Sequence, residues 1–137
     1  MKRNDFQELA RVRIKEARRL LEAECPEGAY YLAGYAAECA LKACIARLTE
    51  RYEFPDKGKA NESWTHDLTR LARAAGVLEK LLDAASRQSE LNENWEIVAK
   101  WTEESRYQRR SRLEAEDLLN ALADPKHGLL RWVKHYW

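Results

Sequence analysis

Apolar residues recur every three or four positions along most of this 137-residue chain, which is the spacing that gives an α-helix one apolar face. In residues 4–24 this face consists of Phe6, Ala10, Ile14, Ala17 and Leu21. The next stretch runs from Pro26 to about Arg51 and carries no charged residue between Ala29 and Ala37. Such a pattern predicts a central helix that its neighbours cover nearly all round.

Shorter stretches of the same periodicity occupy the second half of the chain. They predict helices over residues 65–76, 77–89 and 113–122, and a short helix followed by an irregular passage over 90–111. The polar residues 52–64, which include Pro55 and Gly58, predict a loop. Together the patterns predict one all-α domain over residues 1–137, an up-and-down bundle of roughly four to five helices.

Composition excludes several classes of protein. The chain has 24 Lys and Arg against 23 Asp and Glu, a net charge of +1, which argues against a protein that coats nucleic acid by bulk charge. No apolar run approaches the roughly 20 residues of a membrane span, and the first residues lack the apolar stretch of a signal peptide. We therefore expect a cytoplasmic protein that does not enter the membrane.

The three cysteines, Cys25, Cys39 and Cys44, fit reduced thiols that pack in the core. The C-x4-C spacing of the last two does not aim both sulfurs at one metal ion. The chain also lacks Gly-rich phosphate loops and the G-x-S-x-G, H-E-x-x-H and E-x-x-H motifs. We expect neither a metal nor a cofactor.

The order of the segments is distinctive. A long amphipathic first helix precedes AYYLAGYAAECALKACIARL, HDLTRLARAAG, NWEIVAKWTEESRY and a last helix ending LLRWVKHYW. With Tyr35-Ala36-Ala37-Glu38 before Ala40-Leu41-Lys42, this order resembles a HEPN domain (higher eukaryotes and prokaryotes nucleotide-binding). The resemblance implies an all-α bundle that is generally a homodimer. It also implies a minimal nucleotidyltransferase as a frequent partner, often in a toxin–antitoxin pair.

Catalytic members of that family are metal-independent ribonucleases with an R-x4–6-H motif, in which Arg steadies the scissile phosphate and His moves protons. Arg106 stands at about the position of the family's Arg. The motif would then require a His at position 111, 112 or 113, and these positions hold Ser, Arg and Leu. Arg131 and His135 would share one face of a helix, which makes them a displaced catalytic candidate. The competing interpretation is a surface pair beside Trp132.

A basic run is the candidate for ligand binding, because between Lys100 and Arg112 five basic residues stand against two acidic ones. Guanidinium groups hold phosphates and an aromatic ring stacks a base, which gives the nucleotide- or RNA-binding candidates Arg106, Tyr107, Arg109, Arg110 and Arg112. Alternatively, the run is a solvated face whose charges pair with nearby carboxylates such as Glu103 and Glu104.

Glu38 is an exceptional charge within the apolar second helix. Buried carboxylates are rarely left unpaired, so we expect either Lys42, four residues on, or Arg106 as its partner. The pair Glu38 and Lys42 is interpreted as a structural polar pair rather than a catalytic one. His66 is expected to be a first-turn residue whose ring packs or bonds locally.

Three hypotheses for function follow. The preferred one is a non-catalytic, homodimeric binding module that partners a minimal nucleotidyltransferase or binds a nucleotide or RNA. The alternative is a metal-independent ribonuclease toxin that uses Arg131 and His135, or Arg106 with a histidine brought in by folding. The third is a bundle that only mediates protein association, through an exposed apolar edge around Trp132 and Trp137.

Overall fold

The computed structural model of the chain describes residues 1–52 and 63–137, so most of the expected 52–64 loop lies outside it. Within those residues the fold is all-α, as predicted, and has no strand. The elements are α1 (Arg3–Glu22), α2 (Pro26–Tyr52), α4 (Leu68–Ala74), α5 (Leu78–Arg87), α6 (Ser89–Ala99), the 3-10 helix η1 (Glu103–Tyr107), α7 (Arg112–Ala123) and α8 (Leu129–Val133). The described α-helices outnumber the four to five expected, because the second half of the chain divides into short pieces.

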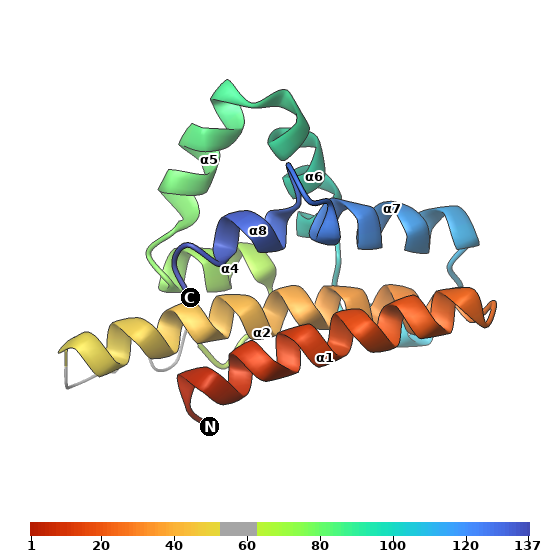
Figure 1. The fold of residues 1–137 in the computed structure, drawn as a ribbon, viewed down its shortest axis with the longest axis horizontal. Helices are drawn as coiled ribbons and strands as arrows, with labels where there is room; N and C mark the ends of the chain where they lie inside the picture. The colour runs from red at the N-terminus through yellow and green to blue at the C-terminus, as the bar shows by residue number, and fades with distance from the viewer. Residues whose placement is uncertain (53–62) are drawn as a thin grey trace.

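The two longest helices, α1 and α2, lie side by side and antiparallel along one side of the molecule (Figure 1). Three members of the predicted apolar face of α1 are buried: Ala10, Ile14 and Ala17. The chain reverses at Glu24, whose φ of 60° is the left-handed conformation of a tight turn. Pro26 then opens α2, where its missing N–H would have had no helical partner. Both long helices are therefore confirmed.

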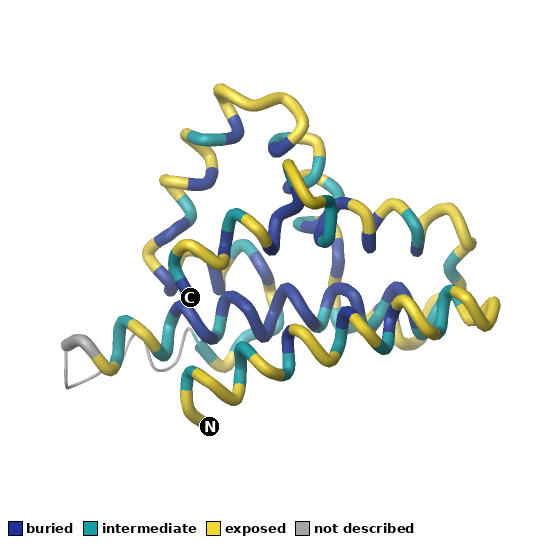
Figure 2. Tube along the Cα trace, in the orientation of Figure 1, coloured by how far each residue is buried: buried dark blue, intermediate teal, exposed yellow. Residues whose placement is uncertain are grey.

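The predicted central helix is α2. It contacts α1, α4, η1, α7 and α8, and Figure 2 shows long buried stretches where these elements cross it. Its buried small residues include Ala29, Ala33, Ala36, Ala37 and Ala40. Because alanine has little bulk, neighbouring helices approach the backbone of α2 closely. None of the described helices, α2 included, is long and apolar enough to span a membrane.

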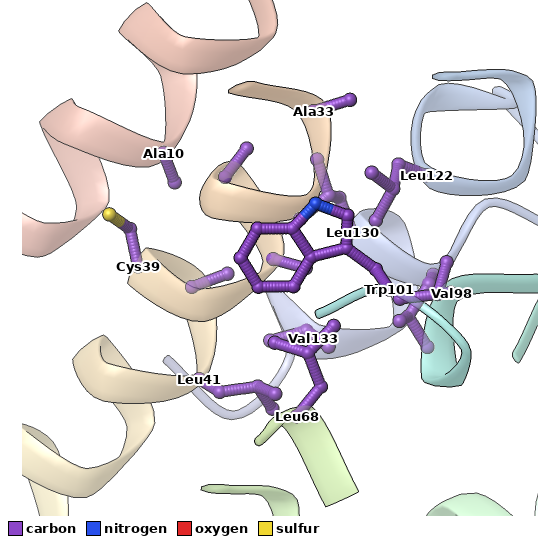
Figure 3. Close-up of a cluster of buried hydrophobic side chains, with 14 of the residues drawn as sticks. Ala10, Ala33, Cys39, Leu41, Leu68, Val98, Trp101, Leu122, Leu130 and Val133 are labelled. Atoms are coloured by element: carbon purple, nitrogen blue, oxygen red, sulfur yellow. The ribbon is translucent and has the colours of Figure 1, made fainter. Parts of the chain in front are cut away.

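Trp101 fills the centre of this core. Its indole is 1% exposed and lies among aliphatic side chains that include Leu41 of α2 and Val133 of α8 (Figure 3). Gly34 of α2 makes room for it, since a Cβ atom at that position would lie 2.1 Å from the indole Nε1. A glycine inside a helix costs about 1 kcal/mol of helix propensity, and here the burial of an indole offsets that cost.

The C-terminal segment buries apolar side chains in the same core, namely Leu129, Leu130, Val133 and Trp137. Arg3 of α1 reaches across and donates a 2.6 Å hydrogen bond to the main-chain oxygen of Trp137. The expected exposed edge around Trp132 and Trp137 is therefore wrong. Trp137 is buried and Trp132 is half-buried, because α8 folds back against α2 and α7.

The cysteines divide into two groups. Cys39 and Cys44 are buried in α2, as predicted. Cys25 is exposed, so the expectation that it packs in the core is wrong. It occupies the turn between α1 and α2, where its thiol lies 3.6 Å from the carbonyl oxygen of Ala23.

Candidate functional site

Residues 106–112, the basic segment, lead from η1 into α7 along the surface. The exposed candidates for ligand binding are Arg106, Tyr107, Arg109 and Arg112, whereas Arg110 is half-buried. Ser111 ends the segment as the N-cap of α7, because its hydroxyl accepts a hydrogen bond from the Glu114 N–H. The Glu114 carboxylate accepts one from the Ser111 N–H in return, which completes a capping box. The five candidates thus extend from the end of η1 to the first residue of α7.

Carboxylates neutralise three of the four arginines in the basic segment. The nitrogen–oxygen distances are 3.3 Å from Arg109 to Glu27, 2.9 Å from Arg110 to Glu114 and 2.7 Å from Arg112 to Glu116. The first of these pairs joins the segment to the first turn of α2, and the others lie along α7. This is the geometry of a solvated face with its own counter-charges, the competing interpretation of the run.

Arg106 differs from the other three arginines, because no carboxylate pairs with it among the residues that the structure describes. A hydrogen bond to Tyr31 raises the pKa of its guanidinium above the ordinary value, and the exposed ring of Tyr107 adds to the shift. The guanidinium lies 4.9 Å from the centroid of the Tyr107 ring. Tyr31 in turn stacks on the indole of Trp101, with ring centroids 6.1 Å apart. Arg106 is therefore a positioned cation beside an exposed aromatic ring.

Arg110 attaches the basic segment to α2. Its guanidinium lies 4.2 Å from the ring centroid of Tyr30, and its two terminal nitrogens donate to Gln108 and Glu114. Burial raises the pKa of the Tyr30 hydroxyl, which keeps that ring neutral. Less of Arg110 than of Arg106 is open to a ligand.

Glu38 is 1% exposed and receives hydrogen bonds from two sides. Lys42 Nζ donates to Oε1 at 2.9 Å, which is the expected contact on one face of α2. His66 Nδ1 lies 2.9 Å and 3.0 Å from the two carboxylate oxygens. The alternative pairing of Glu38 with Arg106 is wrong, since Arg106 contacts Tyr31 instead. The expectation that His66 bonds locally is also wrong, because the buried carboxylate recruits it as a second donor.

His66 extends this network to η1, since its Nε2 lies 3.1 Å from Oε2 of Glu103. Each ring nitrogen therefore faces a carboxylate. A neutral imidazole has one N–H, so only the protonated ring donates to both sides. The network and the packing around it fasten η1 to α2, and we call this set the interior junction: Gly34, Glu38, His66, Trp101 and Glu103.

Sequence reasoning missed His66 as a partner of Glu38 and Glu103 as a partner of His66. One signal was present, because a lone carboxylate on an apolar helix requires donors beyond its own helix face. His66 also precedes Asp67, the N-cap of α4, whose side chain accepts from the Arg70 N–H and so holds the start of α4 in place. A histidine beside a well-formed cap has a defined position from which to reach α2.

Arg131 and His135 are both exposed and each binds a main-chain oxygen. Arg131 donates to the carbonyl of Pro125, and Nδ1 of His135 lies 3.1 Å from the carbonyl oxygen of Trp132. Among the contacts of the described residues, none joins the two side chains. The structure therefore does not place the His135 ring, as a proton donor, next to the Arg131 guanidinium, as a phosphate-binding group.

The buried thiols are not reactive nucleophiles near neutral pH. Burial raises the pKa of Cys39 to about 11 and that of Cys44 to about 12, so both stay protonated. In the part of the chain that the structure describes, no three His, Cys, Asp or Glu side chains are grouped to hold a metal ion. The groups at the basic segment that can bind a ligand are guanidinium cations and an aromatic ring.

A comparison with protein families gives one assignment for nearly the whole chain. The model of the HEPN domain matches residues 4–135. No curated protein and no solved structure matches the chain. The family resemblance carried by the order of the segments is thus confirmed by an independent comparison.

Proposed function

This chain belongs to the HEPN family, and from that premise we propose that it is a non-catalytic binding module. It acts as a homodimer, holds a nucleotide or RNA at Arg106 and Tyr107, and partners a minimal nucleotidyltransferase. Membership of the family supports a nucleotide- or RNA-related module. The homodimer, the partner and the residues that hold the ligand are the parts of the proposal that go beyond the family assignment.

The observation that carries the proposal is the state of Arg106. It is the arginine of the basic segment that no described carboxylate neutralises, and Tyr31 and Tyr107 hold it in place. A guanidinium presents paired donors to a phosphate, and an exposed aromatic ring such as Tyr107 offers a face on which a base stacks. Both groups come from one turn of η1, so a single nucleotide unit spans them.

The absence of catalysis rests on the histidines. No R-x4–6-H motif is present, and the sequence contains three histidines. Both ring nitrogens of His66 face carboxylates, so neither is free to take a proton from a ribose hydroxyl. His135 contacts a main-chain carbonyl instead of Arg131.

A ribonuclease remains the second candidate, and one observation favours it. His66 contacts Glu103, which lies on the same short helix as Arg106, so folding does bring a histidine to the element that carries the unpaired arginine. Cleavage would require His66 to leave one of its two carboxylates. The two candidates therefore differ in whether His66 is a structural tie or a proton carrier.

Binding is tested by fluorescence anisotropy with a labelled single-stranded RNA. We expect Arg106→Gln to weaken binding at least about tenfold, because it removes a charge-assisted contact to phosphate. Arg112→Gln is the matched control, since it removes one exposed, paired arginine of the same segment and should weaken binding less than about threefold. Equal losses in the two variants would show that Arg106 has no special part in binding.

Catalysis is tested by incubating the purified protein with RNA in the presence of a metal chelator. The proposal expects no cleavage. Cleavage that His66→Ala abolishes and His135→Ala leaves intact would establish the ribonuclease and would identify His66 as its proton carrier. The reverse result would assign that role to His135.

The proposed assembly is tested by co-expression with a small nucleotidyltransferase encoded by a neighbouring gene. We expect the two proteins to purify together, and we expect the chain alone to sediment as a dimer. A gene without such a neighbour, or a chain that sediments as a monomer at micromolar concentration, would contradict this part of the proposal.

A further inference from the structure

A second basic site lies on another part of the molecule, between α1 and the turn that joins α7 to α8. This pocket has a volume of about 450 Å³, and four cationic side chains line it: Arg11, Arg18, Arg131 and Lys134. Its floor is apolar and includes the buried residues Ile14 and Leu130. The cations come from opposite ends of the sequence, so no continuous run of basic residues predicts the pocket.

These four cations lack carboxylate partners among the residues that the structure describes. Asp124 is the acidic side chain in the lining, and its carboxylate is already in use. It accepts hydrogen bonds from the main-chain N–H groups of His127 at 2.7 Å and Lys126 at 3.1 Å. The first of these lowers the pKa of Asp124. Four positive charges against one negative charge leave the pocket strongly cationic.

Aromatic and main-chain contacts position three of the four cations without neutralising them. The guanidinium of Arg11 lies 5.0 Å from the ring centroid of Trp137, and Nζ of Lys134 lies 5.6 Å from it. Trp137 is buried, so its ring is a rigid support for both. Arg131 donates to the carbonyl of Pro125, which orients its guanidinium at the rim. Such pre-ordering reduces the entropy that a ligand must overcome to bind.

We propose that this pocket binds a ligand with two or more adjacent phosphate groups. Gathering like charges over an apolar floor is unfavourable, and a multivalent anion relieves their repulsion. Arginine forks match phosphate oxygens in pairs, and the pocket volume lies within the range of small-molecule sites. A nucleoside triphosphate and the backbone of an RNA strand both supply this chemistry.

The pocket is independent of the function proposed above. It shares no lining residue with the basic segment, and α1 and α8 supply its cations instead of η1. Failure of the Arg106 site therefore leaves this proposal standing, and the reverse also holds. Measuring the two sets of variants side by side separates the outcomes.

The experiment titrates the full chain with tripolyphosphate, ATP, adenosine and a short single-stranded RNA by isothermal calorimetry at low salt. The pocket variant is Arg11→Gln with Arg18→Gln. The matched control is Lys15→Gln with Arg19→Gln, which removes the same charge from exposed positions of the same helix outside the pocket. Arg131→Gln with Lys134→Gln repeats the test from α8, and thermal melting checks that every variant folds.

We expect tripolyphosphate and ATP to bind and adenosine not to bind. Each pocket variant should weaken the binding of tripolyphosphate at least about tenfold, while the Lys15 and Arg19 control changes it less than about threefold. If the source of phosphate is RNA, the strand binds more tightly than ATP. Removing two contacts then lowers the slope of log K against log salt by about 1.4.

Three results would overturn the proposal. The first is that none of the phosphate probes binds the parent chain. The second is an equal loss of affinity in the pocket variants and in the control, which would show a response to net charge alone. The third is tighter binding of an oligoglutamate peptide than of tripolyphosphate, which would assign the pocket to acidic peptides.

Discussion

The interior junction and the basic segment meet at η1, and both contain charged pairs, yet the fold uses them in opposite ways. In the junction, the buried carboxylate of Glu38 receives hydrogen bonds from Lys42 and His66. In the segment, the exposed pair of Arg112 and Glu116 stays in water. A charge removed from water must be paired, whereas an exposed pair contributes little to stability. Burial decides how much a pair matters.

The largest difference between the two regions should appear at Gly34. We expect Gly34→Ala to lower the free energy of unfolding by about 2 kcal/mol or more in denaturant titrations. The new methyl group would overlap the Trp101 indole, which is packed on all sides and has no room to move.

Gly28→Ala is the matched control for Gly34→Ala, because both changes lie on α2 and both improve helix propensity. At Gly28 the new Cβ would meet the flexible end of Leu20 at 3.2 Å, which is able to shift. We expect this variant to be neutral or slightly stabilising. Similar losses in both variants would show that the fit against Trp101 is unimportant.

The next largest effect is expected at His66. His66→Ala removes a donor from the buried Glu38 carboxylate, and we expect a loss of about 2 kcal/mol in the free energy of unfolding. His135→Ala is the control, since that exposed ring contacts one main-chain oxygen and should cost less than about 0.5 kcal/mol. A His66 variant as stable as its control would place the junction in the same class as the surface pairs.

The smallest effects belong to the basic segment, and two adjacent residues sharpen the contrast. Ser111→Ala should cost about 1 kcal/mol, because α7 loses the cap that satisfies the Glu114 N–H. Arg112→Ala should cost about 0.5 kcal/mol or less, because its pair with Glu116 is exposed. Thermal melting of the two variants checks the order. A larger loss for Arg112→Ala would mean that the segment depends on its ion pairs.

Local patterns predicted the elements of the fold well. The apolar stripe of α1 and the uncharged stretch from Ala29 to Ala37 have the periods that their helices show, because side-chain spacing on a helix follows directly from the sequence. The capping box at Ser111 is likewise a local motif, because its residues lie within four successive positions.

Contacts between distant segments were harder to predict. His66 meets Glu38 across a sequence separation of 28, and that contact depends on how α4 crosses α2. The exposed edge expected near Trp137 failed for the same reason, because burial of the last residues depends on where α8 folds back. Of the candidate site, the sequence indicated the basic segment as a whole. It did not separate Arg106 from the neighbours whose charges are paired.

The position of α2 has a consequence for how the molecule opens. α1, α4, η1, α7 and α8 all contact α2, so its central amides stay closed unless several of them leave together. We expect amide protons there to exchange with solvent through global unfolding, and those of α5, which lies away from α2 (Figure 1), to exchange through local fraying. Proteases that require an extended backbone would therefore reach the middle of α2 last.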